Sequence, residues 1–337
     1  MKVIIPVAGI GTRMRPHTHT APKALLHVAG KPILGHILDG LKSYPASELI
    51  FVVGFMGEKI VEYIKKNCRF KYRFVEQKQL RGLGYAIYLA TLGIKGNEPL
   101  LIVLGDTIIE HDLSPIIKGK YDAIGVKIVQ DPRRFGVVEL KDGFVSNLVE
   151  KPQKPVSNLA IIGIYYIKNT LRFKRCLSQV MARKKSEKEE YQLTDALQLL
   201  VKAKVKFTTF NVDGWFDCGK PETILETNRY LLSKTKKTKK IKGSIVIPPT
   251  FISASAIVED SILGPYVSVA DKAVIKNSII RNSIISEGAE VNNSLLDSSL
   301  VGNNAQVNGN FHKFNVGDSS ELGYYYSGFE EYKRDQI

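Results

Sequence analysis

The chain has 337 residues, and this length is enough for two domains with a sizeable core. Hydrophobic residues make up 44% of the chain and charged residues 24%. Its formal net charge of +15 allows nucleic acid, an acidic membrane surface or small polyanions as partners. However, no basic motif interleaved with aromatic residues indicates nucleic-acid binding, and no apolar run is long enough to span a bilayer.

The positions of the three cysteines indicate the cellular compartment of the protein and which kinds of cysteine site it lacks. Cys68, Cys176 and Cys218 lie far apart and form no C-x-x-C pair. This spacing argues against a disulfide framework and against a structural zinc site. It favours a reducing, cytoplasmic location.

The first predicted strand, residues 3–7, runs into a glycine-rich loop that extends to residue 26. The loop contains Gly9 and Gly11, followed by the cations Arg13, Arg15 and Lys23. Glycines let backbone N–H groups approach phosphate oxygens, and the cations neutralise their charge, so the loop suits a polyphosphate. It is neither a P-loop nor a dinucleotide fingerprint. On its glycines alone, a simple strand–loop turn is the stronger interpretation.

Residues 1–233 alternate between strand and helix patterns, which predicts a mostly parallel sheet with helices on both faces. Ligands bind such sheets beyond the carboxyl ends of the strands, where both the glycine-rich loop and Asp106 fall. The predicted helices cover residues 32–41, 58–65 and 84–92, and the further strands residues 49–53, 72–75 and 100–104.

After Asp106 the pattern becomes richer in strands, and a closing helix follows. Strands are predicted at 123–129, 137–140, 144–149, 160–167 and 207–212, and helices at 171–183, 194–203 and 221–232.

From about Gly243 helical patterns disappear, and aliphatic residues recur every five or six positions between small or polar residues. This is a hexapeptide-type repeat, in which each aliphatic side chain points into a triangular prism of stacked coils. An antiparallel β domain is the weaker alternative. The repeating residues are Ile257, Leu263, Val269, Ile275, Ile280, Ile285, Val291, Leu296, Val301 and Val307.

These patterns divide the chain into four parts. Residues 1–233 form an α/β domain, and 234–243 form a basic linker that is interpreted as a solvated connector. The repeats occupy residues 244–316. A tail at 317–337 contains an aromatic cluster with no assigned role.

Two aspartates are candidate ligands for a magnesium ion. If the loop binds a nucleoside triphosphate, charge accumulates on the departing pyrophosphate, and a divalent cation is needed. Asp106 and Asp217 each follow a strand pattern beside a glycine. For Asp106 alone, a capping or turn role is an equal alternative. His17 and His19 flank the loop but have no third ligand nearby, so contact with phosphate or solvent is favoured over a metal site.

The run G-x-G-T-R-M-x-P with Pro22-Lys23 resembles the signature of sugar-1-phosphate nucleotidylyltransferases. Further motifs in matching order extend this resemblance over the first ~230 residues, toward the glucose-1-phosphate thymidylyl- and uridylyltransferases. It implies a Rossmann-like nucleotidyltransferase domain. The repeats resemble the left-handed parallel β-helix of the long forms of these enzymes.

The resemblance also implies roles for individual residues. Arg13 and Lys23 would be catalytic, binding the triphosphate and stabilising the leaving pyrophosphate. Gln77 would read the edge shared by thymine and uracil, Glu150 would bind sugar hydroxyls, and Lys151 the sugar phosphate. The nucleotide-binding set is Ala8, Gly9, Gly11, Thr12, Gln77 and Gly82; the sugar-phosphate set is Gly136, Glu150, Lys151 and Ile161; the metal ligands are Asp106 and Asp217; Gly163 and the Thr194-Asp195 pair also match the family pattern.

The implied reaction is a magnesium-dependent transfer of a nucleotidyl group from dTTP or UTP to a sugar 1-phosphate, with glucose 1-phosphate as the first choice. The phosphate nucleophile has a second pKa near ~6, so no general base is required. Gly84-Tyr85 and Phe135 differ from the residues that the family has at these positions. The identity of the preferred base and of the preferred sugar therefore stays open. The partners are small molecules rather than nucleic acid or membrane.

Two alternatives to this enzyme remain. One is a catalytically silent regulatory or scaffold subunit, which the joint presence of Arg13, Lys23, Asp106 and Asp217 disfavours. The other is a bifunctional enzyme with acetyltransferase activity in the repeats. No histidine occurs at 243–310, and this favours a structural role in a homo-oligomer instead.

Overall fold

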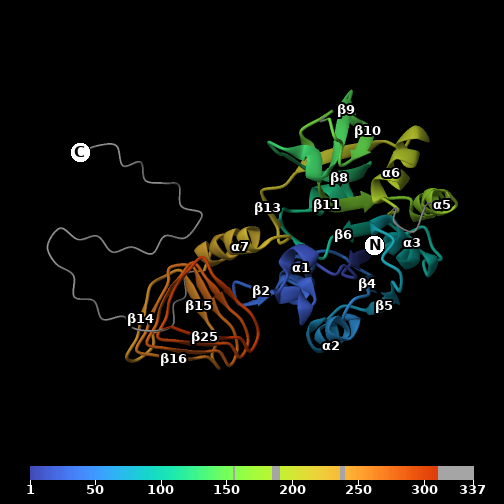
Figure 1. The fold of residues 1–337 in the computed structure, drawn as a ribbon. Helices are drawn as coiled ribbons and strands as arrows, with labels where there is room; N and C mark the ends of the chain where they lie inside the picture. The colour runs from blue at the N-terminus through green and yellow to red at the C-terminus, as the bar shows by residue number, and fades with distance from the viewer. Residues whose placement is uncertain (155, 184–189, 236–239, 310–337) are drawn as a thin grey trace, which may run out of the picture.

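The computed structural model describes residues 1–154, 156–183, 190–235 and 240–309. An α/β domain and a triangular β-helix lie side by side, and helix α7 (Pro221–Ser233) lies between them (Figure 1). In the described part of the chain, no helix is long and apolar enough to cross a membrane.

The first half of the α/β domain is the predicted parallel sheet. β1 (Lys2–Pro6) pairs in parallel with β4 (Glu48–Val53) and with β6 (Leu100–Val103), and β4 pairs in parallel with β5 (Tyr72–Glu76). All three predicted helices of this half are present. They are α1 (Ile33–Leu41), α2 (Gly57–Asn67) and α3 (Leu83–Leu92).

The second half makes the sheet mixed, because β11 (Leu159–Ile167) pairs antiparallel with β6, with β8 (Asp122–Ile128) and with β9 (Gly136–Lys141). β12 (Phe207–Asn211) pairs in parallel with β8 and so extends the sheet. The other elements of this half are α4 (Ser114–Lys118), β10 (Phe144–Glu150), α5 (Thr170–Met181) and α6 (Leu193–Lys202).

Strand β1 shows why helices must cover both faces of the sheet. Val3 and Ile5 are fully buried in the core under α1 and α2, whereas Ile4 is fully buried in the core under α3, α5 and α6. Successive side chains of a strand point to opposite faces, so a continuous apolar run requires cover on both sides.

Two short strands that the sequence did not reveal bring the candidate metal ligands together. β7 (Thr107–Glu110) pairs antiparallel with β13 (Gly214–Asp217), and Asp217 is opposite Thr107. Each has only four residues, and its partner lies about a hundred residues away in the chain. Local periodicity cannot detect such a pair.

The repeats form three parallel sheets around a common core, as expected of a left-handed parallel β-helix. Each strand of one coil pairs with the equivalent strand of the next. The first sheet comprises β14 (Ile245–Val246), β17 (Ile262–Leu263), β20 (Ile279–Arg281) and β23 (Leu295–Asp297); the second β15 (Thr250–Ile252), β18 (Val267–Val269), β21 (Ile284–Ile285) and β24 (Leu300–Val301); the third β16 (Ile257–Glu259), β19 (Val274–Lys276), β22 (Glu290–Asn292) and β25 (Gln306–Asn308).

One predicted inward residue is wrong. Ile257 is 50% exposed, and its neighbour Val258 points into the prism instead, where it contacts the core. Two adjacent aliphatic residues occur here, and the side-chain alternation of the strand allows only one of them to face inward. The end of the predicted repeats at 310–316, the tail at 317–337 and linker residues 236–239 lie outside the described residues.

A buried amide connects α7 to both parts of the molecule. The Oδ1 atom of Asn228 accepts a hydrogen bond from the backbone N–H of Ala29 at 2.9 Å and another from Ser268 Oγ at 2.6 Å. Its Nδ2 atom donates to the carbonyl of Tyr266 at 3.1 Å. Because Asn228 is fully buried, these bonds fix the β-helix against the segment that follows the glycine-rich loop.

Candidate functional site

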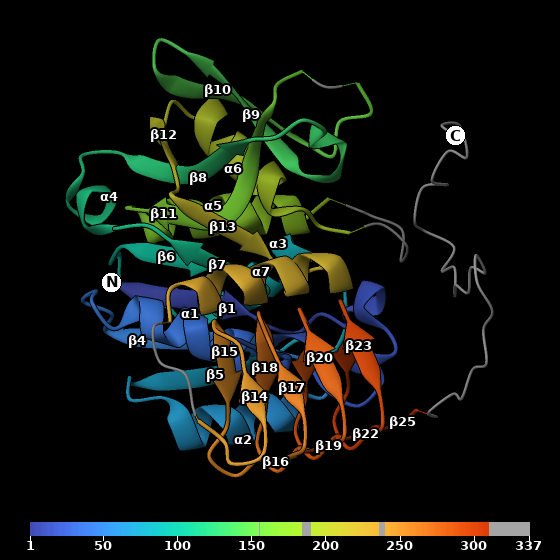
Figure 2. The same cartoon turned by 90° about the vertical axis from the view of Figure 1, so that its left-hand side faces the viewer.

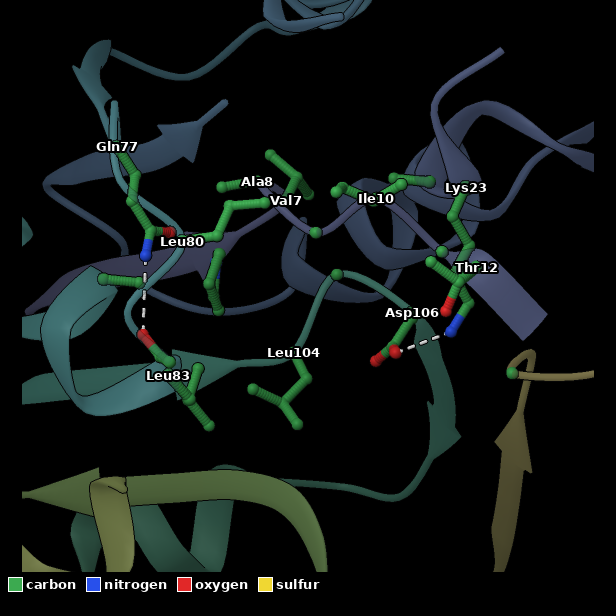
Figure 3. A pocket seen from close by; sticks show the side chains of 18 of the residues that line it. Val7, Ala8, Ile10, Thr12, Lys23, Gln77, Leu80, Leu83, Leu104 and Asp106 are labelled. Carbon is green, nitrogen blue, oxygen red and sulfur yellow. Dashed lines mark hydrogen bonds and ion pairs between the residues drawn. The ribbon is translucent and has the colours of Figure 1, made fainter. Parts of the chain in front are cut away.

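A cavity of about 450 Å³ opens at the carboxyl ends of β1 and β6. Figure 3 shows Gln77 on one side of this cavity, with Lys23 and Asp106 on the opposite side. Every residue predicted to bind the nucleotide lines it. These residues are Ala8, Gly9, Gly11, Thr12, Arg13, Lys23, Gln77 and Gly82.

The two loop glycines have different physical reasons to be glycine. Gly11 has φ of +70°, and a methyl group there would lie 3.0 Å from the Cβ atom of Lys23. A larger residue would therefore strain the backbone and crowd Lys23. Gly9 is exposed, and a methyl group there would meet no atom within 4 Å. The space beside Gly9 is open for a ligand.

This difference gives a first prediction. Gly9→Ala is expected to leave the melting temperature unchanged but to raise KM for the nucleoside triphosphate about tenfold, because the methyl group occupies ligand space. Gly96→Ala is the matched control, since a methyl group there also meets nothing within 4 Å. Thermal melting and initial rates would check this. A Gly9→Ala protein with the KM of the wild type would place the phosphates elsewhere.

The cations and Asp106 form the polar end of the cavity. Lys23 Nζ lies 2.7 Å from Asp106 Oδ2. Burial works against the charge of Asp106, but the Lys23 ammonium, a hydrogen bond from Thr107 and the Arg13 guanidinium hold its pKa below the ordinary value. Asp106 is therefore a carboxylate at neutral pH.

The opposite end of the cavity holds a buried amide. Gln77 is 5% exposed, and its Nε2 atom donates a long hydrogen bond of 3.5 Å to the carbonyl of Gly82. Gly82 has φ of +93°, and a methyl group there would lie 2.7 Å from the carbonyl oxygen of Tyr191. A glycine is thus required where this loop passes close to Tyr191.

A second cavity of about 180 Å³ adjoins the first. Arg13, Leu83, Leu104 and Asp106 line both cavities, so the two cavities adjoin at these side chains. Most of the residues predicted to bind the sugar phosphate line the second cavity, together with the second candidate metal ligand. They are Gly136, Glu150, Ile161, Gly163, Thr194 and Asp217.

Glu150 is held by its neighbours in this second cavity. Thr194 Oγ1 donates to Glu150 Oε2 at 3.1 Å, and a methyl group at Gly136 would lie 2.9 Å from the same oxygen. Burial raises the pKa of Glu150, while Lys151 and the Thr194 hydrogen bond oppose this effect. Lys151 does not line the cavity; its Nζ lies 3.8 Å from Glu150 Oε1, and its side chain is 56% exposed.

The two candidate metal ligands, Asp106 and Asp217, lie beside one another. Cys218 N–H donates to the carbonyl of Asp106 at 3.0 Å, which places Asp217 beside Asp106. Burial, and then the charge of Asp106, raise the pKa of Asp217. No group of three or more potential ligands occurs among the described residues. Two carboxylates beside an open cavity fit a magnesium ion, which keeps waters and binds phosphate oxygens.

The histidines of the loop do not adjoin the phosphate end. His17 belongs to the short helix at His17–His19 and is not in the lining of the first cavity. A methyl group at Gly302 of the β-helix would lie 3.4 Å from its Nδ1 atom, and burial lowers its pKa. The prediction for His17 was contact with phosphate or solvent. The structure places this half-buried residue against the β-helix and outside the lining of the first cavity. His19 is exposed to solvent, as the prediction allowed.

Several lining residues were missed from the sequence. Trp215 lines the second cavity, and its buried Nε1 atom has no hydrogen-bond partner within the described part of the chain. Its distance of two residues from Asp217 along β13 could have indicated this, because alternate residues of a strand share a face. Leu80 and Glu190 line the first cavity, and Arg134 and Gln192 the second, without a sequence signal that we can identify.

Comparison with protein families and curated proteins gives a consistent result. A family model described as "Nucleotidyl transferase" matches residues 2–234. A protein named bifunctional protein GlmU from Methanocaldococcus jannaschii is 40% identical over 248 residues, which are 73% of this chain and 57% of that protein. A glucose-1-phosphate thymidylyltransferase from Streptomyces griseus is 30% identical over 320 residues, covering 86% of this chain and 88% of the relative.

A solved structure supports the same fold. The crystal structure of a UDP-glucose pyrophosphorylase complexed with UDP-glucose aligns with a TM-score of 0.60 and 26% sequence identity. The alignment covers 69% of this chain and 99% of that protein. About two thirds of this chain thus aligns with nearly all of that enzyme, whereas the chain spans little more than half of the GlmU relative.

Proposed function

Since the chain belongs to the nucleotidyl transferase family, we propose that it transfers a nucleotidyl group from dTTP or UTP to a sugar 1-phosphate. Glucose 1-phosphate is the proposed acceptor, and the products are a nucleoside diphosphate sugar and pyrophosphate. The observation that carries this proposal is the junction of the two cavities, where Arg13 and Asp106 line both. At this junction, the α-phosphate of a nucleotide bound in the first cavity would contact the phosphate of a sugar 1-phosphate bound in the second cavity.

The nucleotide would lie with its base at Gln77 and its phosphates at the glycine-rich loop (Figure 3). The buried Gln77 amide can donate to O4 and accept from N3–H, which thymine and uracil share. Its long bond to Gly82 is weak enough for the base to replace. The thymine methyl group distinguishes the two bases, and Leu80 is an apolar lining residue that could contact it.

The sugar would lie in the second cavity. Glu150 is the acceptor for sugar hydroxyls, and the unpartnered Nε1 of Trp215 is a donor for another. Phe135 packs edge-on against Trp215, with ring centroids 5.4 Å apart, and forms an apolar wall. Lys151 would have to turn from its position beside Glu150 to reach the sugar phosphate.

The proposed reaction is a single in-line displacement. An oxygen of the sugar phosphate forms a bond to the α-phosphorus, and the bond from that phosphorus to the bridging oxygen of the β-phosphate breaks. Arg13 and Lys23 neutralise the charge that develops on the departing pyrophosphate. A magnesium ion bound by Asp106 and Asp217 would supply further charge neutralisation at the phosphates. Asp106 would then exchange its partner Lys23 for the ion.

A substrate panel tests the proposal. The protein is incubated with Mg²⁺, each of the eight common NTPs and dNTPs in turn, and glucose, galactose or glucosamine 1-phosphate, and pyrophosphate is measured. We expect release with dTTP, UTP or both, and with glucose 1-phosphate. No release with any pyrimidine nucleotide would contradict the proposal and would favour a silent regulatory or scaffold subunit.

Glu150 gives a pH-dependent prediction. Because burial raises its pKa, Glu150 takes up a proton at a higher pH than an ordinary glutamate, and the protonated form is a poorer acceptor for sugar hydroxyls. We expect KM for the sugar phosphate to rise as the pH falls through this pKa. The substrate phosphate also titrates near ~6, and Asp217 in the same cavity has a raised pKa, so Glu150→Gln is the control that keeps these titrations and loses only that of Glu150. Identical pH profiles of KM for both proteins would exclude this role.

The bifunctional alternative has one observation in its favour. The GlmU relative is named as a bifunctional protein, and 248 aligned residues cover 57% of its length. Free thiol release from acetyl coenzyme A with glucosamine 1-phosphate would detect an acetyltransferase in this chain. Because no histidine occurs at 243–310, we expect no release.

The remaining proposals concern the surroundings of the enzyme. The three free cysteines are compatible with a cytoplasmic location, and small molecules are the proposed partners in place of nucleic acid or membrane. A homo-oligomer that uses the β-helix is also proposed.

A further inference from the structure

The second cavity would have to accept a dianion, although its lining is rich in carboxylic acids. A sugar 1-phosphate has a second pKa near ~6, so it carries about two negative charges at neutral pH. The charged residues in the described lining are Asp106, Glu150, Asp217, Arg13 and Arg134. With three acids against two arginines, this lining has no excess of positive charge. The sugar phosphate therefore needs a cation that the triphosphate does not already engage.

Arg134 is a cation of the second cavity alone. Arg13 lines both cavities, and its proposed partner is the triphosphate, whereas Arg134 lines the second cavity and not the first. Lys151 lines neither cavity, since its Nζ lies beside Glu150 and its side chain points toward solvent. Among the described residues, Arg134 is thus the only positive side chain in the second cavity that the first cavity does not share.

The backbone around Arg134 is fixed at the wall of this cavity. Arg134 ends a short helix at Pro132–Arg134, and β9 begins two residues later at Gly136. The N–H of Phe135 donates to the carbonyl of Pro132 at 3.0 Å, and both Phe135 and Gly136 line the second cavity. Figure 2 shows β9 at the end of the α/β domain that lies away from the β-helix, as Figure 1 does. The α/β domain therefore supplies this cation itself.

The adjacent residue, Arg133, has a partner, whereas Arg134 has none. The Nε and Nη2 atoms of Arg133 each donate to a carboxylate oxygen of Asp131 at 2.8 Å, and Arg133 lines neither cavity. These bonds lower the pKa of Asp131 to about 2, so the pair is charged at neutral pH. Arg134 forms no ion pair and no side-chain hydrogen bond with any other described residue. Its five N–H donors are available for a ligand.

The charge of Arg134 also acts on the candidate metal site. Burial, and then the charge of Asp106, raise the pKa of Asp217, and the cations Lys23, Arg13 and Arg134 oppose this rise. Such an effect requires the guanidinium of Arg134 to lie on the same side of the cavity as Asp217. A sugar phosphate has to approach this side in order to reach the α-phosphate at the junction of the two cavities.

We propose that Arg134 binds the phosphate group of the acceptor sugar 1-phosphate. This inference rests on the proposed function, because that function assigns the second cavity to the sugar phosphate. A planar guanidinium donates two parallel N–H bonds to two phosphate oxygens, which the ammonium of a lysine cannot do in a fixed geometry. Two of the three terminal oxygens are then held by Arg134, and the third is free to attack the α-phosphorus. Arg134 thus both neutralises and orients the nucleophile.

The test is calorimetric binding of glucose 1-phosphate to the full-length protein, with Mg²⁺ and the α,β-methylene analogue of dTTP or UTP, which cannot transfer its nucleotidyl group. We expect Arg134→Gln to raise the Kd for glucose 1-phosphate about 10- to 100-fold and to leave the Kd of the analogue unchanged. Arg133→Gln is the matched control: it removes the same charge from the adjacent residue, and we expect both wild-type Kd values. Circular dichroism and thermal melting establish that each variant is folded.

Three results would overturn the inference. The first is a wild-type Kd for glucose 1-phosphate in Arg134→Gln; a higher Kd in Lys151→Gln would then give the role to Lys151. The second is an equal loss in Arg133→Gln, which would show that only the general electrostatic field matters. The third is a loss in Arg134→Gln that disappears at alkaline pH, which would trace the effect to the ionisation of Asp217.

These outcomes are separate from those of the proposed function, because the methylene analogue permits no turnover. A wild type that binds glucose 1-phosphate through Arg134 but releases no pyrophosphate from dTTP or UTP would contradict the proposed reaction and leave the inference standing. A wild type that releases pyrophosphate while Arg134→Gln binds glucose 1-phosphate normally would contradict the inference alone. No binding of glucose 1-phosphate to the wild type would contradict both.

Discussion

Replacing Asp106 by Asn should reduce the rate of pyrophosphate release at saturating substrate by about 10²-fold or more, with the protein still folded. The amide keeps the shape of the carboxyl group but loses the charge that would hold the metal ion and that now pairs with Lys23. Of the four described residues that line both cavities, Asp106 is the only carboxylate.

The control for this variant is Asp142→Asn. Asp142 is an exposed carboxyl in the turn between β9 and β10 and lines neither cavity, and its φ of +54° is a conformation that asparagine tolerates. We expect the wild-type rate for Asp142→Asn. An Asp106→Asn protein that is as active as this control would remove Asp106 from the metal site.

Arg13→Ala should have the second-largest effect, a loss of about 10²–10³-fold in kcat/KM. The guanidinium lines both cavities and is one of the charges that hold Asp106 ionised. If it neutralises charge that develops only during phosphoryl transfer, most of the loss appears in kcat, whereas a purely binding role raises KM.

Arg15 provides the comparison for Arg13. It is exposed, lies two residues further along the loop, and is absent from the lining of both cavities. Arg15→Ala removes the same charge from the same loop, so it controls for the general electrostatic field. Equal losses for the two variants, in steady-state kinetics at several salt concentrations, would show that Arg13 acts only through this field.

The parallel half of the fold and the place of the site could be predicted because their signals are local. The continuous apolar run Val3-Ile4-Ile5 predicts a strand that is buried on both faces. The glycine-rich run after this strand predicts a ligand-binding loop. The repeat spacing likewise predicted the prism. Such signals depend only on neighbouring residues.

The features that could not be predicted from the sequence depend on contacts between segments that are distant in the chain. The pairing of β7 with β13 joins residues near 108 to residues near 216, and together with the bond from Cys218 N–H to the Asp106 carbonyl it brings Asp217 to Asp106. The same pairing puts Trp215 into the second cavity. Likewise, the inward choice between Ile257 and Val258 depends on the pairing of β16 with β19.

The central claim is that both substrates meet at one junction and react in a single displacement, and isotope exchange tests it most directly. Labelled pyrophosphate is incubated with the protein, Mg²⁺ and dTTP or UTP, with and without glucose 1-phosphate, and label in the nucleotide is measured. The account predicts exchange only when the sugar phosphate is present, because no nucleotidyl-enzyme intermediate forms. Exchange without the sugar phosphate, or none with it for either nucleotide, would contradict the account.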